Sequence, residues 1–172
     1  MAILPILVAP DPRLKAKARK VEAVDDDIRK LIDDMLETMY DAPGIGLAAP
    51  QVGVLKRVIV LDVAGKDEPP APMALVNPEV IWESEELNVY EEGCLSLPTH
   101  YAEVERPAVV KVRYLDRDGA KHEVEADGLF ATCVQHEIDH LDGVLFVDYI
   151  SSLKRNIILR KLKKEKEQAR SA

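Results

Sequence analysis

Hydrophobic residues recur at helical spacing in three parts of this chain, and they predict three helices. The first spans residues 25–40, with Asp25 or Asp26 as N-cap and an apolar face of Ile28, Leu31, Ile32, Met35, Leu36 and Met39. The second lies between Asp127, a suitable N-cap, and Gly143, a suitable C-terminal stop. Because apolar residues surround most of this second helix, we expect it to be buried. The third begins at Ser151 and carries its apolar residues in its first turns: Leu153, Ile157, Ile158 and Leu162.

Extended apolar segments between the predicted helices predict strands. The clearest pair is a hairpin whose limbs, residues 109–115 and 121–125, are joined by the turn Asp118-Gly119. The other extended segments are expected at residues 57–63, 73–82, 87–90 and 144–150. Helices at the start, late middle and end of the chain, with strands grouped between them, indicate an α+β fold. We therefore expect antiparallel and mixed sheets around a central buried helix, followed by a C-terminal helix.

The composition fits one globular domain, residues 1–172, because 47% of the residues are hydrophobic and 31% are charged. The longest apolar stretches are too short to cross a bilayer, and the first ten residues lack the basic region of a signal peptide. The two cysteines argue against a disulfide framework and for a reducing compartment. We therefore expect a cytoplasmic protein without membrane contact.

Charge is distributed unevenly along the chain. The net charge is −8, but residues 151–172 hold eight Lys or Arg against two Glu, a net of +6, which leaves −14 on the residues before them. The acidic body repels nucleic acid, so we expect no direct sequence-specific nucleic-acid binding. Any contact with a polyanion is therefore confined to the basic C-terminal helix. A solvated charged tail is the alternative interpretation of such a run.

The central helix carries the pattern H-E-x-x-H at residues 136–140. Two histidines four residues apart lie on one helical face, so both imidazoles can reach one metal ion, and Glu137 can serve as a proton carrier beside it. This is the signature of zinc metalloproteases. Ordinary core histidines are the alternative, but burying these groups without a partner or a metal would cost several kcal/mol. The pattern therefore predicts a metal site.

The third ligand is not determined by this pattern. The remaining candidates are Cys94, Cys133, His100 and His122, of which His122 falls on an exposed-looking limb of the hairpin. A catalytic site would use three protein ligands and a water, whereas a structural zinc site needs four. A closed site of Cys94, Cys133, His136 and His140 is thus an alternative, although the paired spacings of zinc fingers are absent.

A second stretch with chemical content, Gly44 to Gln51, matches the pattern G-x-G-x-x-A. The dinucleotide-binding interpretation fails because that motif follows a strand and opens a helix. Here the stretch follows a helix and contains Pro50. Glycine content alone predicts a sharp turn between helix and strand.

Three stretches of the chain resemble the three motifs of the peptide deformylases, in order and at similar separations. They are G-I-G-L-A-A-P-Q at 44–51, E-G-C-L-S at 92–96 and Q-H-E-I-D-H at 135–140. The opening P-D-P-R-L, the D-R-D-G hairpin and the E-A-D-G-L lead into the helix are also similar, so the resemblance spans nearly the whole chain. The charged helical end resembles the bacterial form of the family.

The resemblance implies a reaction and a metal. The reaction is hydrolytic removal of the N-formyl group from the N-terminal formyl-methionine of nascent peptides. Cys94, His136 and His140 would bind one divalent metal with water as fourth ligand, and Glu137 would act as general base and acid. The family favours iron(II), while zinc, nickel and cobalt also suit this donor set.

Further residue roles follow from the same resemblance. Gln51 and the backbone N–H of Leu95 would meet the developing oxyanion. The substrate main chain would pair with Ile45, Gly46 and Gly93, and the methionine slot would be lined by Leu129 and Cys133. Residues 99–102 depart from the family, which often carries a basic residue there. Arg106 matches a common arginine, whose pairing with Glu92 would brace the Cys94 loop; a plain surface arginine is the alternative.

The resemblance also implies a monomer that docks on the ribosome through its basic C-terminal helix. Two other functions stay open at the level of the residues. Another H-E-x-x-H metallopeptidase would share the helix motif, but would not require Gln51 and Cys94 in these settings. A noncatalytic structural zinc module would have no need of Glu137.

Overall fold

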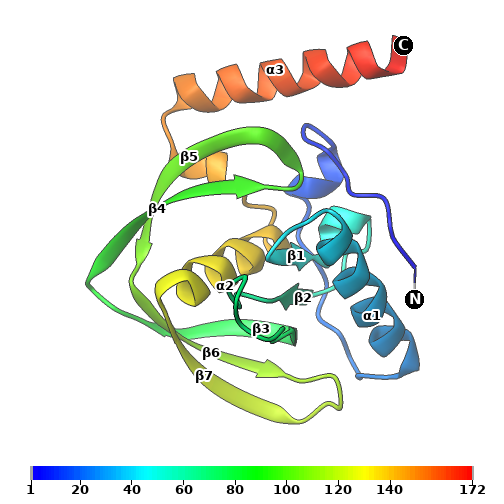
Figure 1. Ribbon diagram of the computed structural model, residues 1–172, viewed down its shortest axis with the longest axis vertical. Helices are drawn as coiled ribbons and strands as arrows, with labels where there is room; N and C mark the ends of the chain where they lie inside the picture. The colour runs from blue at the N-terminus through cyan, green and yellow to red at the C-terminus, as the bar shows by residue number, and fades with distance from the viewer. Residues whose placement is uncertain (1, 172) are drawn as a thin grey trace.

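The computed structural model describes residues 2–171, and the side chains of residues 2–169 (Figure 1). Three α-helices are present: α1 (Asp26–Asp41), α2 (Gly128–Leu141) and α3 (Ser152–Ser171). Three short 3-10 helices connect other elements: η1 (Pro12–Lys15), η2 (Ala49–Val52) and η3 (Phe146–Tyr149). The α+β class predicted from the sequence is confirmed.

The strands form two sheets (Figure 1). The five-stranded sheet has the order β1-β2-β3-β6-β7, with bounds Gly46–Ala48, Val58–Leu61, Met73–Glu83, Val109–Leu115 and Lys121–Asp127. The second sheet is the hairpin of β4 (Leu87–Cys94) and β5 (Leu97–Pro107). Every pairing between these strands is antiparallel, and parallel pairing among the described residues is confined to a bridge between Arg19 and Lys56.

The five-stranded sheet separates α1 from α2, and β2 shows how the sequence achieves this. All four residues of β2 are buried, because successive side chains enter opposite layers. Ile59 and Leu61 pack in the cluster that contains α2, whereas Val58 and Val60 pack in the cluster that contains α1. A strand buried on both faces therefore has a continuous run of apolar residues in its sequence, such as V-I-V-L in β2.

The helix ends largely follow their predicted caps. The Asp25 carboxylate accepts the backbone N–H of Ile28 at 3.0 Å, so α1 begins one residue after its cap. Asp127 occupies the N-cap of α2, but its side chain makes no capping hydrogen bond. Gly143 follows α2 with a φ of +75°, the left-handed conformation that ends a helix.

Two extended-segment predictions need correction. Residues 144–150, predicted to be extended, contain the 3-10 helix η3, whose Phe146 and Val147 are buried in a third core cluster. Strand β5 was not predicted, because its inward positions are not uniformly apolar. Val104 points into the core, but the next inward position is Arg106, which is 4% exposed. A charged residue at a core position breaks the alternation that would identify the strand.

Helix α3 lies across β5 and the N-terminal segment (Figure 1). Leu162 is buried there, and Ile158 and Leu159 pack partly against the same cluster. The other two apolar residues of its first turns, Leu153 and Ile157, are 71% and 42% exposed. None of the helices among residues 2–171 has the length and apolar character needed to cross a membrane.

Candidate active site

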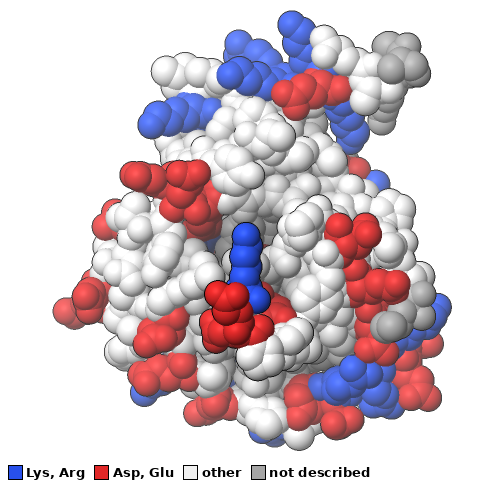
Figure 2. Space-filling view, in the orientation of Figure 1, with Lys and Arg blue, Asp and Glu red and all other residues white. Residues whose placement is uncertain are grey.

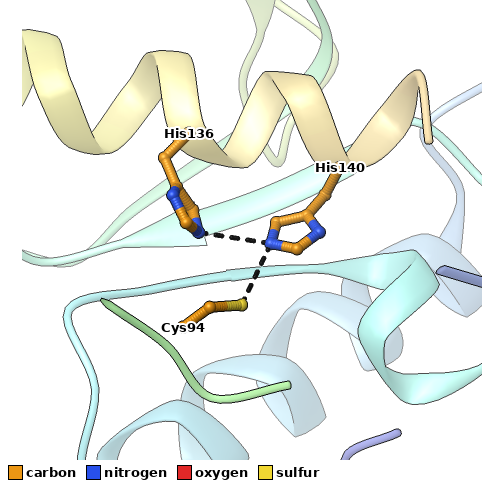
Figure 3. A group of neighbouring side chains, drawn as sticks. All are labelled: Cys94, His136 and His140. Atoms are coloured by element: carbon orange, nitrogen blue, oxygen red, sulfur yellow. Dashed lines mark hydrogen bonds between the residues drawn. The ribbon is translucent and has the colours of Figure 1, made fainter. Parts of the chain in front are cut away.

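The end of β4 and one face of α2 bring Cys94, His136 and His140 together (Figure 3). The Sγ of Cys94 lies 3.3 Å from Nε2 of His140, which lies 3.2 Å from Nε2 of His136. Ligand atoms about 2.0–2.3 Å from a tetrahedral metal are separated by about 3.3–3.6 Å. These two separations are close to those values, and all three donor atoms lie within 4.8 Å of one another, so the group could hold a single metal ion. A thiolate with two imidazoles suits zinc or a neighbouring transition metal.

Glu92 orients the first histidine. The Nδ1 of His136 lies 3.0 Å from a Glu92 carboxylate oxygen, and both side chains are buried. With Nδ1–H donating to the carboxylate, the lone pair of Nε2 points to Cys94 and His140, the arrangement typical of a metal-bound histidine. Burial favours the neutral acid, but hydrogen bonds from His136 and Arg106 outweigh it and lower the pKa of Glu92.

Arg106 ties four elements around this carboxylate. It donates two hydrogen bonds to Glu92, at 2.7 and 2.9 Å, and a third to Asp139 at 2.7 Å. The Tyr149 hydroxyl donates to the same Asp139 at 2.7 Å, and the Arg106 guanidinium lies 4.7 Å from the centre of the Tyr149 ring. Arg106 therefore holds β4, β5, α2 and η3 together. The pairing with Glu92 that was expected from the sequence is one of these contacts. The sequence did not predict the roles of Asp139 and Tyr149 in this network, because no local pattern distinguishes them from ordinary polar residues.

Glu137 is buried beside these three side chains. Its Oε1 atom has no hydrogen-bond partner among the described residues, and burial raises its pKa to about 7. A Cβ atom placed on Gly46 would collide with Oε2 of Glu137 and would lie 2.9 Å from Sγ of Cys133. Glycine at position 46 therefore allows the backbone of β1 to approach the carboxylate closely.

Gln51 is held rigidly next to Cys94. Its side-chain oxygen accepts the N–H of Ala48 at 2.9 Å, and its Nε2 donates to the Ser96 hydroxyl at 3.1 Å. The same Nε2 lies 3.4 Å from Sγ of Cys94. The amide is thus fixed with its N–H group beside the sulfur of Cys94.

A cleft of about 650 Å³ opens in front of these groups. Its lining includes eight of the eleven residues to which the resemblance assigned site roles: Ile45, Gly46, Gln51, Gly93, Cys94, Leu95, His136 and Glu137. His140 lies deeper and is 1% exposed. Ile6, Pro98 and Tyr101 also line the cleft; they were missed because isolated apolar residues carry no pattern that marks a site.

Three other predicted residues lie outside the lining of this cleft. Cys133 is buried behind its wall, with Sγ 3.7 Å from the carbonyl oxygen of Ile45, and burial raises the pKa of its thiol well above the usual value. Leu129 lies in the first turn of α2 and is 45% exposed. His122 stacks on Tyr114 in the β6–β7 hairpin and bonds to Asp116, as expected for a residue without a role at the metal.

A thiol and two imidazoles that could hold one metal ion, a buried glutamate and a fixed amide at the base of an open cleft are the groups typical of a metal-dependent hydrolase. Comparison with known proteins gives the family. The model of the polypeptide deformylase family matches residues 3–156. The chain belongs to this family, whose metal-dependent hydrolases remove the N-formyl group from nascent peptides. The interpretations as another metallopeptidase or as a structural zinc module are thereby set aside.

Similar proteins match along nearly their whole length. The chain is 60% identical over 164 residues to the peptide deformylase of Rhizobium meliloti (strain 1021), which covers 95% of this chain and 94% of the relative. A crystal structure of the Ehrlichia chaffeensis peptide deformylase in complex with actinonin superposes with a TM-score of 0.92 at 43% identity, covering 96% and 98% of the two chains. The Legionella pneumophila peptide deformylase gives a TM-score of 0.90 at 48% identity, covering 98% and 99%.

Proposed function

We propose that Cys94, His136 and His140 hold one divalent metal in this deformylase and that Glu137 is its general base and acid. The observation that carries the proposal is the convergence of three ligand atoms within 4.8 Å of one another, beside a buried carboxylate. A metal bound there would act as a Lewis acid that lowers the pKa of a coordinated water and polarises the formyl oxygen.

The neighbouring groups would transfer the proton and stabilise the developing oxyanion. Glu137 is the only carboxylate among the described residues that line the cleft, so it is the group placed to take a proton from the attacking water. It would pass that proton to the leaving amine. The Gln51 amide and the backbone N–H of Leu95 would donate to the developing oxyanion, and Gln51 needs no rearrangement because Ala48 and Ser96 already hold it.

The substrate main chain would add along the free edge of β1. Because β1 is the edge strand of its sheet, Ile45 and Gly46 can pair with an extended peptide, while Gly93 faces the peptide from β4. We assign Leu129 and Cys133 to the slot for the methionine side chain. The position of Cys133 directly behind Gly46 supports this assignment.

For the metal we propose iron(II), with zinc, nickel or cobalt as substitutes. An open site with a thiolate ligand would make the ferrous form sensitive to oxygen. The test is formate release from a short formyl-methionyl peptide by enzyme reconstituted with iron(II) without air, and by a matched zinc preparation. We expect higher activity with iron, and Glu137→Gln should keep the metal and lose turnover.

Controls separate these claims. An acetyl-methionyl peptide should release no acetate, and an internal peptide bond should stay intact. Cleavage of only the internal bond would contradict the proposed reaction. Equal activity with both metals would contradict the proposal that iron(II) is the metal of this enzyme. Loss of metal from Glu137→Gln would mean that this glutamate is a ligand.

We further propose that the chain acts as a cytoplasmic monomer, one metallohydrolase domain over residues 1–172, that docks on the ribosome through α3. Lys and Arg gather over α3, whereas Asp and Glu dominate the rest of the visible face (Figure 2). Seven of the eight basic residues after position 150 have described side chains, and Arg170 lies outside them. This contrast supports an electrostatic contact between α3 and a polyanion.

A further inference from the structure

A second groove, of about 500 Å³, continues from the candidate active-site cleft beneath α3. Ile6 and Pro98 line both the cleft and this groove, so they form the boundary between them. His100 also connects the two, because it lines the cleft and its Nε2 lies 4.0 Å from the carboxylate of Glu165, which lines the groove. We propose that this groove binds the downstream part of the formyl-peptide substrate, beyond the residues held in the cleft.

One wall of the groove is fixed to the catalytic residues. The backbone N–H of Leu7 donates to the carbonyl of Gln51 at 2.7 Å, and that of Ala9 donates to the carbonyl of Ser96 at 2.8 Å. Gln51 and Ser96 are the pair whose side chains are joined beside Cys94. The N-terminal wall is therefore positioned by the same backbone that positions the catalytic amide.

The opposite wall is α3, which is also held in place. Leu162 anchors it in the core, and Nζ of Lys166 donates to the carbonyl of Val8 at 3.3 Å across the groove. Lys166 is half-buried, so the helix is held against the body beyond Leu162 as well. A groove with two fixed walls can bind a chain without first being ordered.

The lining suits a peptide of variable sequence. Its apolar part consists of Ile6, Leu7, Val8, Pro98, Leu162 and Ala169. Its four charged residues cancel in sign: Asp11 pairs with Arg13 at 2.8 Å, and Glu165 stands beside Lys166. Because the groove carries no net charge, it would contact the backbone and apolar side chains of the peptide and would discriminate only weakly between peptides of different charge. An enzyme that acts on many different nascent chains needs that tolerance.

The inference rests on the proposed function, since the formyl end must occupy the cleft for the chain to continue into the groove. The test compares kcat/KM for formyl-Met-Ala-Ser with that for a nine-residue peptide that extends it with neutral residues. We expect the longer peptide to be favoured about tenfold, mainly through KM, the gain from removing about 60 Å² of apolar surface from water.

Two variants locate the effect. Ala169→Trp would fill the groove and should reduce the long-to-short ratio to near one. Gln168→Trp introduces the same side chain on the adjacent, exposed position of α3 and should keep the ratio of the wild-type enzyme. A photoreactive residue at the sixth position of the longer peptide should cross-link to residues 6–13 or 162–169.

The outcomes separate the two proposals. Failure of the wild-type enzyme to release formate from the tripeptide would contradict the proposed function itself. Three results would contradict peptide binding in the groove. The wild-type enzyme could turn over the tripeptide with a long-to-short kcat/KM ratio near one, both tryptophan variants could lose this ratio equally, or the cross-links could form elsewhere.

Discussion

Cys94 and Cys133 are the same side chain in two different environments. Cys94 is half-buried at the end of β4, with its sulfur 3.3 Å from His140. Cys133 is buried, lies outside the group of three ligand atoms, and contacts the Ile45 carbonyl. Burial disfavours its thiolate, and the thiolate is the form that binds metals. The environments therefore favour a three-ligand site over a closed four-ligand site.

Serine substitutions test this difference. Cys94→Ser should weaken metal binding by more than about 100-fold, since loss of an outer partner alone costs 10–100-fold. Cys133→Ser should keep one metal per chain and change mainly the KM for formyl peptides. Metal content after dialysis against a chelator series checks both variants. Loss of metal from both would favour the closed site.

At the scale of elements, the end of α1 is joined to the end of β2 beside the cleft. The Tyr40 hydroxyl donates to the Asp62 carboxylate at 2.6 Å, and the N–H of Asp62 donates to the carbonyl of Ile45 at 2.8 Å. Asp62 also accepts the N–H groups of Ala64 and Ala71, which closes the exposed loop after β2. This one carboxylate thus connects the helix, the loop and the backbone of the cleft wall.

The connection predicts a pH dependence of stability. Burial and the hydrogen bond to Asp62 raise the pKa of Tyr40 to about 12, above the value of about 10 in an unfolded chain. A raised pKa means that the stabilisation is fully present below pH 10 and is lost as pH rises from 10 to 12. Tyr40→Phe should lower the free energy of unfolding by about 1 kcal/mol at pH 8, as expected for loss of one hydrogen bond.

Urea unfolding at pH 8 and pH 11 gives the measurement. The difference between wild type and Tyr40→Phe should shrink at the higher pH. Tyr114 and Tyr149, whose pKa values are also raised, titrate in both proteins and so cancel in this difference. A difference that stays constant between the two pH values would contradict the assignment to Tyr40.

At the scale of the whole molecule, charge is separated between a basic α3 and an acidic body (Figure 2). Such a distribution would orient the enzyme toward a polyanion, through a contact that weakens as salt rises. Truncation after Leu162 keeps the anchor of α3 in the core and removes four of the eight Lys and Arg residues that follow position 150. It should weaken co-sedimentation with ribosomes, while formyl-Met-Ala-Ser hydrolysis stays nearly unchanged.

A charge reversal separates electrostatics from packing. Lys163→Glu with Lys164→Glu alters two exposed side chains and leaves Lys166 on Val8. It should weaken co-sedimentation as the truncation does, and the intact chain should dissociate as salt is raised. Unchanged co-sedimentation after truncation, or no co-sedimentation of the intact chain at low salt, would favour the alternative that the end of α3 is a solvated charged tail.

Local periodicity was sufficient wherever a feature depends on neighbours along the chain. The caps and apolar face of α1, the β6–β7 hairpin and the shared face of His136 and His140 all follow from residues a few positions apart. The α+β class also followed from the order of such elements. These features could be predicted because helix and strand geometry repeats over a few residues.

Features that depend on distant contacts were decided only by the tertiary structure. Two cysteines were available as the third ligand, and the turn between β4 and β5 brings Cys94 to the histidines while Cys133 packs behind Gly46. Strand β5 escaped prediction because Arg106 occupies a core position, which is stable only when Glu92 and Asp139 neutralise it there. Likewise, Lys166 meets Val8 because α3 folds back over the N-terminal segment. Burial and pairing across the fold set these outcomes, and local sequence spacing does not encode them.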